Sequence, residues 1–92
     1  MKVHHIDPAA VAAAVRARQL MAEARSAAFD NLTELVAALE TARTLSDSVA
    51  AGGELYGVGL RDLASRLSED LLGRGRSLQA LADRERRGLL AH

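Results

Sequence analysis

The sequence predicts an all-α helical hairpin that pairs into a four-helix bundle, and three observations support this prediction. Hydrophobic residues make up 49% of the 92-residue chain, yet Phe29 and Tyr56 are its only aromatic residues, which favours helices over strands. Apolar residues recur in steps of three and four on both sides of a single glycine-rich stretch. A short chain without cysteine has a small core, and association is a common source of additional stability.

The first helical arm is expected over residues 8–51, after an irregular lead over residues 1–7. Asp7 supplies a side-chain acceptor for an N-cap, and Pro8 fits the first helical position, where its missing N–H costs nothing. We favour one continuous helix over two helices broken at Asp30-Asn31. The apolar stripe of this arm comprises Phe29, Leu32, Leu35, Val36, Leu39, Ala42, Leu45 and Val49.

A turn over residues 52–59, with four glycines in eight positions, separates this arm from a second helical arm over residues 60–91. Gly73 and Gly75 interrupt the second stripe, and they indicate a kink, a short break or the close approach of another backbone. The whole chain, 1–92, is expected to form one domain. The second stripe comprises Leu60, Leu63, Ala64, Leu67, Leu71, Leu78, Leu81, Ala82 and Leu89.

Two helices that meet along one stripe leave much of each stripe uncovered, which predicts an interface with a second copy or with one larger protein partner. Leu39 and Leu67 lie in the middle of the stripes and are expected to be fully buried. Tyr56 either packs over the end of its own hairpin or contacts the partner. The predicted interface residues are Leu32, Leu35, Val36, Leu39, Tyr56, Leu60, Leu63, Leu67 and Leu71.

The charge distribution favours an antiparallel homodimer. The formal net charge is zero, but residues 1–29 carry +2, residues 30–72 carry −5 and residues 73–92 carry +3. Folding the chain near residue 55 brings both basic segments to one end, opposite an acidic half. An antiparallel copy would place unlike charges side by side, and these charges would set orientation more than affinity. Ordinary solvated faces are the alternative interpretation.

No catalytic, cofactor or metal site is predicted, and no small-molecule substrate is evident. His4, His5, Asp7 and His92 are competent ligands by type, but we interpret the histidines as ordinary terminal residues. Zero net charge argues against nucleic acid, although Arg74, Arg76 and the cluster Arg84, Arg86 and Arg87 keep a nucleic-acid-associated regulator as an alternative. No apolar run is long enough to span a membrane, and we expect a cytoplasmic protein.

The function expected from these features is that of a small non-catalytic interaction module, an adaptor or accessory subunit. The chain also resembles the small helical-hairpin substrates of type VII secretion, because Ile6-Asp7-Pro8 opens the first arm and Leu55-Tyr56-Gly57 fits the Leu version of the family's turn motif. The resemblance implies an exported helical hairpin, which is a second alternative. The chain lacks the Trp of that motif and a Tyr-x-x-x-Asp/Glu near its C-terminus.

Overall fold

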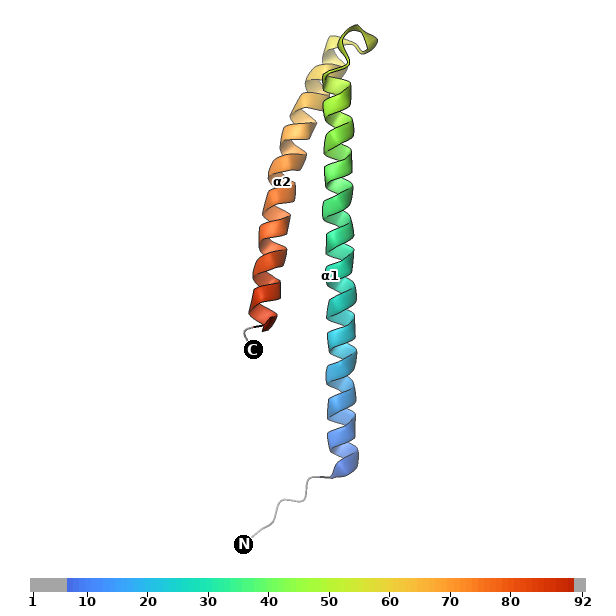
Figure 1. The fold of residues 1–92 in the computed structure, drawn as a ribbon, viewed down its shortest axis with the longest axis vertical. Coiled ribbons are helices and arrows are strands. Elements are labelled where there is room, and N and C mark those ends of the chain that lie inside the picture. The colour runs from blue at the N-terminus through green and yellow to red at the C-terminus, as the bar shows by residue number, and fades with distance from the viewer. Residues whose placement is uncertain (1–6, 91–92) are drawn as a thin grey trace. The chain divides into compact units, whose positions relative to one another are not determined.

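The computed structural model describes residues 7–90 and contains two long helices and no strand within that range. Helix α1 spans Pro8–Ala50, the short 3-10 helix η1 spans Gly53–Leu55, and helix α2 spans Val58–Leu90. The chain divides into two compact units, Met1–Asn31 and Leu32–His92. In the second unit, the last part of α1 and all of α2 lie side by side around the turn (Figure 1). The predicted all-α helical hairpin is therefore confirmed.

Helix α1 begins as its first residues predict. The backbone N–H of Ala9 donates to Oδ1 of Asp7 at 3.0 Å, and the N–H of Val11 donates to the carbonyl of Asp7 at 3.0 Å. These bonds satisfy two of the N–H groups that a helix start leaves free. The helix then runs through Asp30 and Asn31 without a break, so the continuous helix is the correct interpretation.

The unit Met1–Asn31 contributes only helix α1 to the described residues, and its larger apolar side chains face solvent. Among residues 7–31, Phe29 alone is partly covered. An isolated helix of this length is marginal in water because most helix stability in proteins comes from packing one face. The exposed large apolar residues of this unit are Val11, Val15, Leu20 and Met21.

The turn of the hairpin depends on Gly52 and Gly53. The N–H of Gly52 donates to the carbonyl of Val49 at 3.1 Å, which tightens the end of α1. Gly53 has φ of 58°, in the left-handed region that favours glycine. A Cβ at position 52 would lie only 2.5 Å from Cδ2 of Tyr56. Tyr56 therefore packs against its own turn, which is one of the two roles expected for it.

The two helices of the hairpin meet along a seam of residues that recur in alternating steps of three and four. This spacing is the 3.5-residue repeat of coiled-coil packing. The buried residues at the seam are small, and none of the described residues buries a large side chain completely. The seam comprises Leu32, Val36, Leu39, Arg43, Ser46 and Ala50 on α1, and Arg61, Ala64, Ser68, Leu71, Gly75, Leu78 and Ala82 on α2.

The predicted stripes match this seam only in part. Their members Leu35, Leu45, Leu60, Leu63, Leu67 and Leu81 are exposed. Their members in the seam are Leu32, Val36, Leu39, Ala64, Leu71, Leu78 and Ala82. The prediction that Leu67 is fully buried is wrong, because 47% of Leu67 is exposed. The same prediction is wrong for Leu39, which lies in the seam but is only partly buried. The short turn holds the two backbones close together, so Ser46, Ala64 and Ser68 occupy the seam there and the bulkier leucines point aside.

Helix α2 continues through Gly73 and Gly75, so the short break considered for this segment is wrong. A Cβ at either position would meet nothing within 4 Å. No close approach within the described chain therefore explains these two glycines, each of which weakens a helix by about 1 kcal/mol relative to Ala.

Candidate interaction surface

One polar network crosses the seam and fixes the two helices against each other. Arg43 bonds Glu40 through Nη2–Oε1 at 2.5 Å and Nε–Oε2 at 3.1 Å, and its Nη1 lies 3.5 Å from Oδ2 of Asp47. Oδ1 of Asp47 accepts a hydrogen bond from the buried hydroxyl of Ser68 on α2. The hydrogen bond from Arg43 lowers the pKa of Glu40 and raises that of Arg43. This network links residues 40–47 of α1 to the middle of α2.

The side of the seam that carries this network is polar, with a shallow groove along it. The groove has a volume of about 500 Å³ and an apolar floor, where Gly75 leaves a gap because it lacks a side chain. Polar and charged residues from both helices stand around it. The lining residues are Thr33, Val36, Ala37, Leu39, Glu40, Leu71, Leu72, Gly75, Arg76 and Gln79.

The opposite side of the seam is apolar. Thr33 and Glu40 of α1 line the groove together with Leu72 and Gln79 of α2. The side of α1 that points away from the groove therefore lies beside the corresponding side of α2, and together they form one face. Helix geometry, at about 100° per residue, places six larger apolar residues on that face. We call it the leucine face, and it comprises Leu35, Leu45, Val49, Leu60, Leu63 and Leu67.

The leucine face is exposed despite its chemistry. Leu60 is 58% exposed and Leu63 is 64% exposed. Leu35 and Leu45 are exposed as well, and only Val49 is partly covered. Single exposed leucines are common on folded chains, whereas several on one face make that face a candidate interaction surface.

One ion pair bounds the leucine face on α2. Nε of Arg74 lies 2.9 Å from Oδ1 and 3.0 Å from Oδ2 of Asp70, one helical turn earlier. This pair occupies the next turn after Leu67, and exposed Leu81 follows two turns beyond Arg74 on the same side. The face is therefore electrically neutral over these turns.

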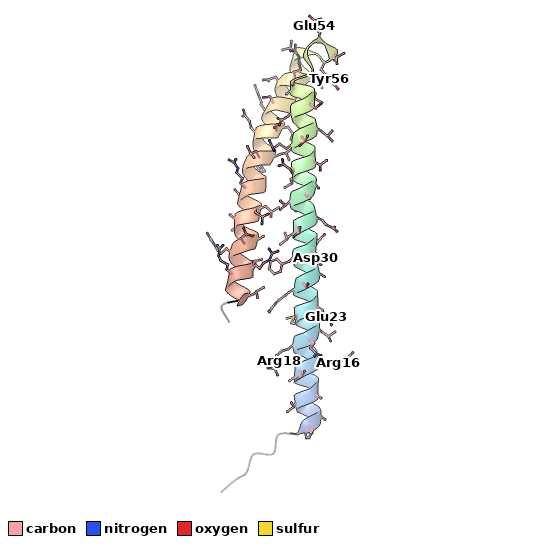
Figure 2. The ribbon with its side chains drawn as sticks, in the orientation of Figure 1. Arg16, Arg18, Glu23, Asp30, Glu54 and Tyr56 are labelled. Carbon is pink, nitrogen blue, oxygen red and sulfur yellow. The ribbon has the colours of Figure 1, made fainter. Side chains whose placement is uncertain are left out.

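The turn adds exposed groups beside the leucine face. Leu55 and Val58 are among the most exposed apolar residues of the chain. Glu54 and Tyr56 lie at the turn end of the hairpin (Figure 2). Glu54 is exposed and makes no ion pair within residues 7–90.

The structure divides the nine predicted interface residues among three environments. Leu32, Val36, Leu39 and Leu71 lie in the seam, where the hairpin itself partly covers them. Leu35, Leu60, Leu63 and Leu67 lie on the leucine face, and Tyr56 lies at the turn. Leu45 and Val49 belong to the face but were absent from the predicted interface, although both belong to the predicted stripe.

The remaining candidates for chemistry are surface groups. Arg74 is paired with Asp70, and Arg76 lines the groove. Arg84, Arg86 and Arg87 are exposed near the end of α2. Within residues 7–90, no group of three or more His, Asp or Glu side chains could hold a metal ion. His4, His5 and His92 lie outside the described residues.

No helix among the described residues is long and apolar enough to cross a membrane. Comparison of the chain with protein-family models, with curated proteins and with solved structures finds no match.

Proposed function

We propose that this chain is a non-catalytic helical module that binds another protein chain through its leucine face. It would act in the cytoplasm as an adaptor or accessory subunit, either by homodimerisation or by docking on one larger partner. The observation that supports this proposal is the contrast across the seam, where one side is polar and the other exposes several leucines.

The energetics of the leucine face favour an interface over a solvated surface. Complete burial of a leucine side chain stabilises a protein by roughly 1.5–3 kcal/mol relative to exposure. Leu35, Leu45, Leu60, Leu63 and Leu67 are about half exposed. Covering them would therefore contribute roughly 1 kcal/mol each, before the cost of association is subtracted.

The test is affinity capture with the full chain, tagged and co-expressed with an untagged second copy in the same cells. The wild-type chain should retain a partner, either the untagged copy or a different protein. A chain with Leu60→Ser and Leu67→Ser should lose that partner. A chain with Glu69→Ser and Gln79→Ser changes two exposed residues on the polar side of α2 and should retain it.

Circular dichroism of each purified variant would establish that it is still helical. Equal recovery by all three chains, or no partner for the wild type, would contradict the proposal.

A second candidate, an exported helical hairpin, is favoured by one observation. Leu55-Tyr56-Gly57, which resembles the turn motif of type VII secretion substrates, lies in the turn between α1 and α2. A Cβ at Gly57 would meet nothing within 4 Å, so Gly57→Ala should leave the hairpin folded. The test is export from the protein's own host. If export depends on this glycine, the wild-type chain should be found in the culture medium and the Gly57→Ala chain should stay inside the cells.

A further inference from the structure

We propose that the leucine face binds a second copy of this chain, antiparallel to the first, across a two-fold axis at Leu63. This inference rests on the proposed function, because it names the partner of the same face. The structure supports it through the spacing of the leucines, the neutrality of the face and the position of one unpaired carboxylate.

The leucine stripe on α2 is nearly the same in both chain directions. Leu60, Leu63 and Leu67 are separated by steps of three and four, with Leu63 in the middle. An antiparallel copy centred on Leu63 places Leu60 opposite Leu67 of the second copy and Leu67 opposite its Leu60. Such a surface is complementary to itself, which is what a two-fold interface requires.

The same arrangement brings the α1 side of the two faces together. Val49 lies within about one helical turn of the level of Leu63, because the hydrogen bond between Asp47 and Ser68 sets the register of the two helices. An antiparallel copy would then place Val49 of α1 near Val49 of the second copy. Apolar residues of both helices thus meet apolar residues, in the arrangement of a four-helix bundle.

The charges at the border of the face suit a second copy. Asp70 and Arg74 neutralise each other, so two copies of the face do not repel. Arg74 lies eleven residues beyond Leu63, which is about 16 Å along the helix. Glu54 lies beyond Leu63 in the other direction, at the turn. In the antiparallel dimer, Arg74 of each copy therefore lies near the level of Glu54 of the other.

Both groups are available for this contact. The bonds from Arg74 to Asp70 use Nε, which leaves the two Nη groups free to bond a second carboxylate. Glu54 is exposed and has no ion pair in the described part of the chain. The dimer would pair each Glu54 with one Arg74 at each end of the interface.

The first experiment measures the mass of the wild-type chain by light scattering at tens of micromolar, together with its melting temperature over a range of concentrations. We expect a mass near twice 9.8 kDa and a melting temperature that rises with concentration. Leu63→Arg should reduce the mass to that of one chain. Ser65→Arg adds the same charge two residues further along α2, at an exposed position on the polar side. This variant should remain a dimer.

If Leu63→Arg does not fold, a crosslinking arm keeps the inference testable. The chain contains no cysteine, so Leu63→Cys and Ser65→Cys each introduce a single thiol. A short bis-maleimide crosslinker should join two copies through Cys at position 63 and should join few through position 65. Equal crosslinking at both positions would overturn the proposed face.

A charge exchange tests the antiparallel orientation. Glu54→Arg alone and Arg74→Glu alone should each weaken dimerisation by about tenfold at low salt, because each replaces two attractive pairs with two repulsive ones. The double variant restores both pairs with exchanged signs and should regain most of the wild-type affinity. A double variant that is weaker than either single variant would overturn the orientation.

A wild-type chain that is monomeric, with a melting temperature independent of concentration, would overturn the second copy as partner. If that monomer still retained a different protein through Leu60 and Leu67, the proposed interaction module would stand and this inference alone would fail. If it retained nothing, both would fail.

Discussion

The two sides of the hairpin seam are built from the same two helices but have opposite chemistry. On one side, Arg43 joins Glu40 and Asp47, and Asp47 accepts a hydrogen bond from Ser68 across the seam. On the other side, Leu60 and Leu63 project into solvent. The polar side satisfies its groups within the hairpin, whereas the apolar side does not cover its own surface.

This difference shows how residues of the same helical turns are divided between the seam and the surface. The seam is closed by small residues such as Ala64 and Ser68. The larger leucines of the same turns stay exposed, so the seam alone buries few large apolar groups. The proposed interface would bury the exposed leucines.

The largest expected effect comes from changing the size of a seam residue. Ala64 is buried in the seam, so Ala64→Leu should destabilise the hairpin by about 2–3 kcal/mol through overpacking. Ala80→Leu makes the same change at an exposed position of the same helix and should cost less than about 0.5 kcal/mol. Urea denaturation followed by circular dichroism measures both. Equal effects would mean that Ala64 is not a seam residue.

The next effect compares a seam leucine with a leucine of the exposed face. Leu39→Ala should cost about 2 kcal/mol at any protein concentration, because the hairpin itself partly covers Leu39. Leu67 is 47% exposed, so Leu67→Ala should lower the stability of the monomer by about 1 kcal/mol or less. Its cost should rise with protein concentration if a partner copy covers it. Denaturation midpoints of both variants at two concentrations decide this, and a Leu67→Ala cost larger than that of Leu39→Ala in dilute solution would reverse the assignment.

The sequence was sufficient to predict the elements of the fold. Asp7-Pro8 predicted the start of α1, and Gly52 and Gly53 predicted its turn, because each uses local backbone chemistry that needs no tertiary contact. The stripe also identified Leu32, Val36 and Leu39 as seam residues. The same stripe also contained Leu35, which is exposed.

The side of each helix that packs near the turn could not be predicted from hydrophobicity. Two overlapping stripes run along α1, one through Leu45 and Val49 and one through Ser46 and Ala50, and a hydropathy pattern prefers the first. In the structure, the stripe through Ser46 and Ala50 faces α2. Where two backbones pack closely, small side chains fit between them better than large apolar ones. The contact between Asp47 and Ser68 was also missed. The spacing of Glu40, Arg43 and Asp47 could have indicated the ion pairs within α1, but nothing in the sequence links them to α2.

A smaller effect is expected at two glycines of α2, exposed Gly73 and the seam residue Gly75. Gly73→Ala and Gly75→Ala should each stabilise the hairpin by up to about 1 kcal/mol, because a Cβ at either position meets nothing within 4 Å and Ala favours the helix. Gly75→Ala also places a methyl group at the groove. Thermal melts of both variants measure the gain. Gly53→Ala is the contrasting control, because φ of 58° at that residue makes the substitution destabilising.

The smallest effect is the response of the polar side to acid. The hydrogen bond from Arg43 lowers the pKa of Glu40 below its ordinary value near 4.5, so the folded chain binds a proton at this group less readily than the unfolded chain. The stabilisation is therefore complete above pH 4.5 and is lost as the pH falls through the lower, folded pKa. Because the pair lies at the surface, the loss should be small and should shrink further in high salt.

Glu40→Gln removes the titrating group and should flatten this part of the stability profile below pH 4.5, while the leucine face is unchanged. NMR titration of the Glu40 carboxyl checks the same point directly, and Arg43→Met should return its pKa to the ordinary range. A Glu40 pKa that is the same with and without Arg43 would mean that the bond does not persist in solution. The polar side would then be held to α2 by Asp47 and Ser68 alone.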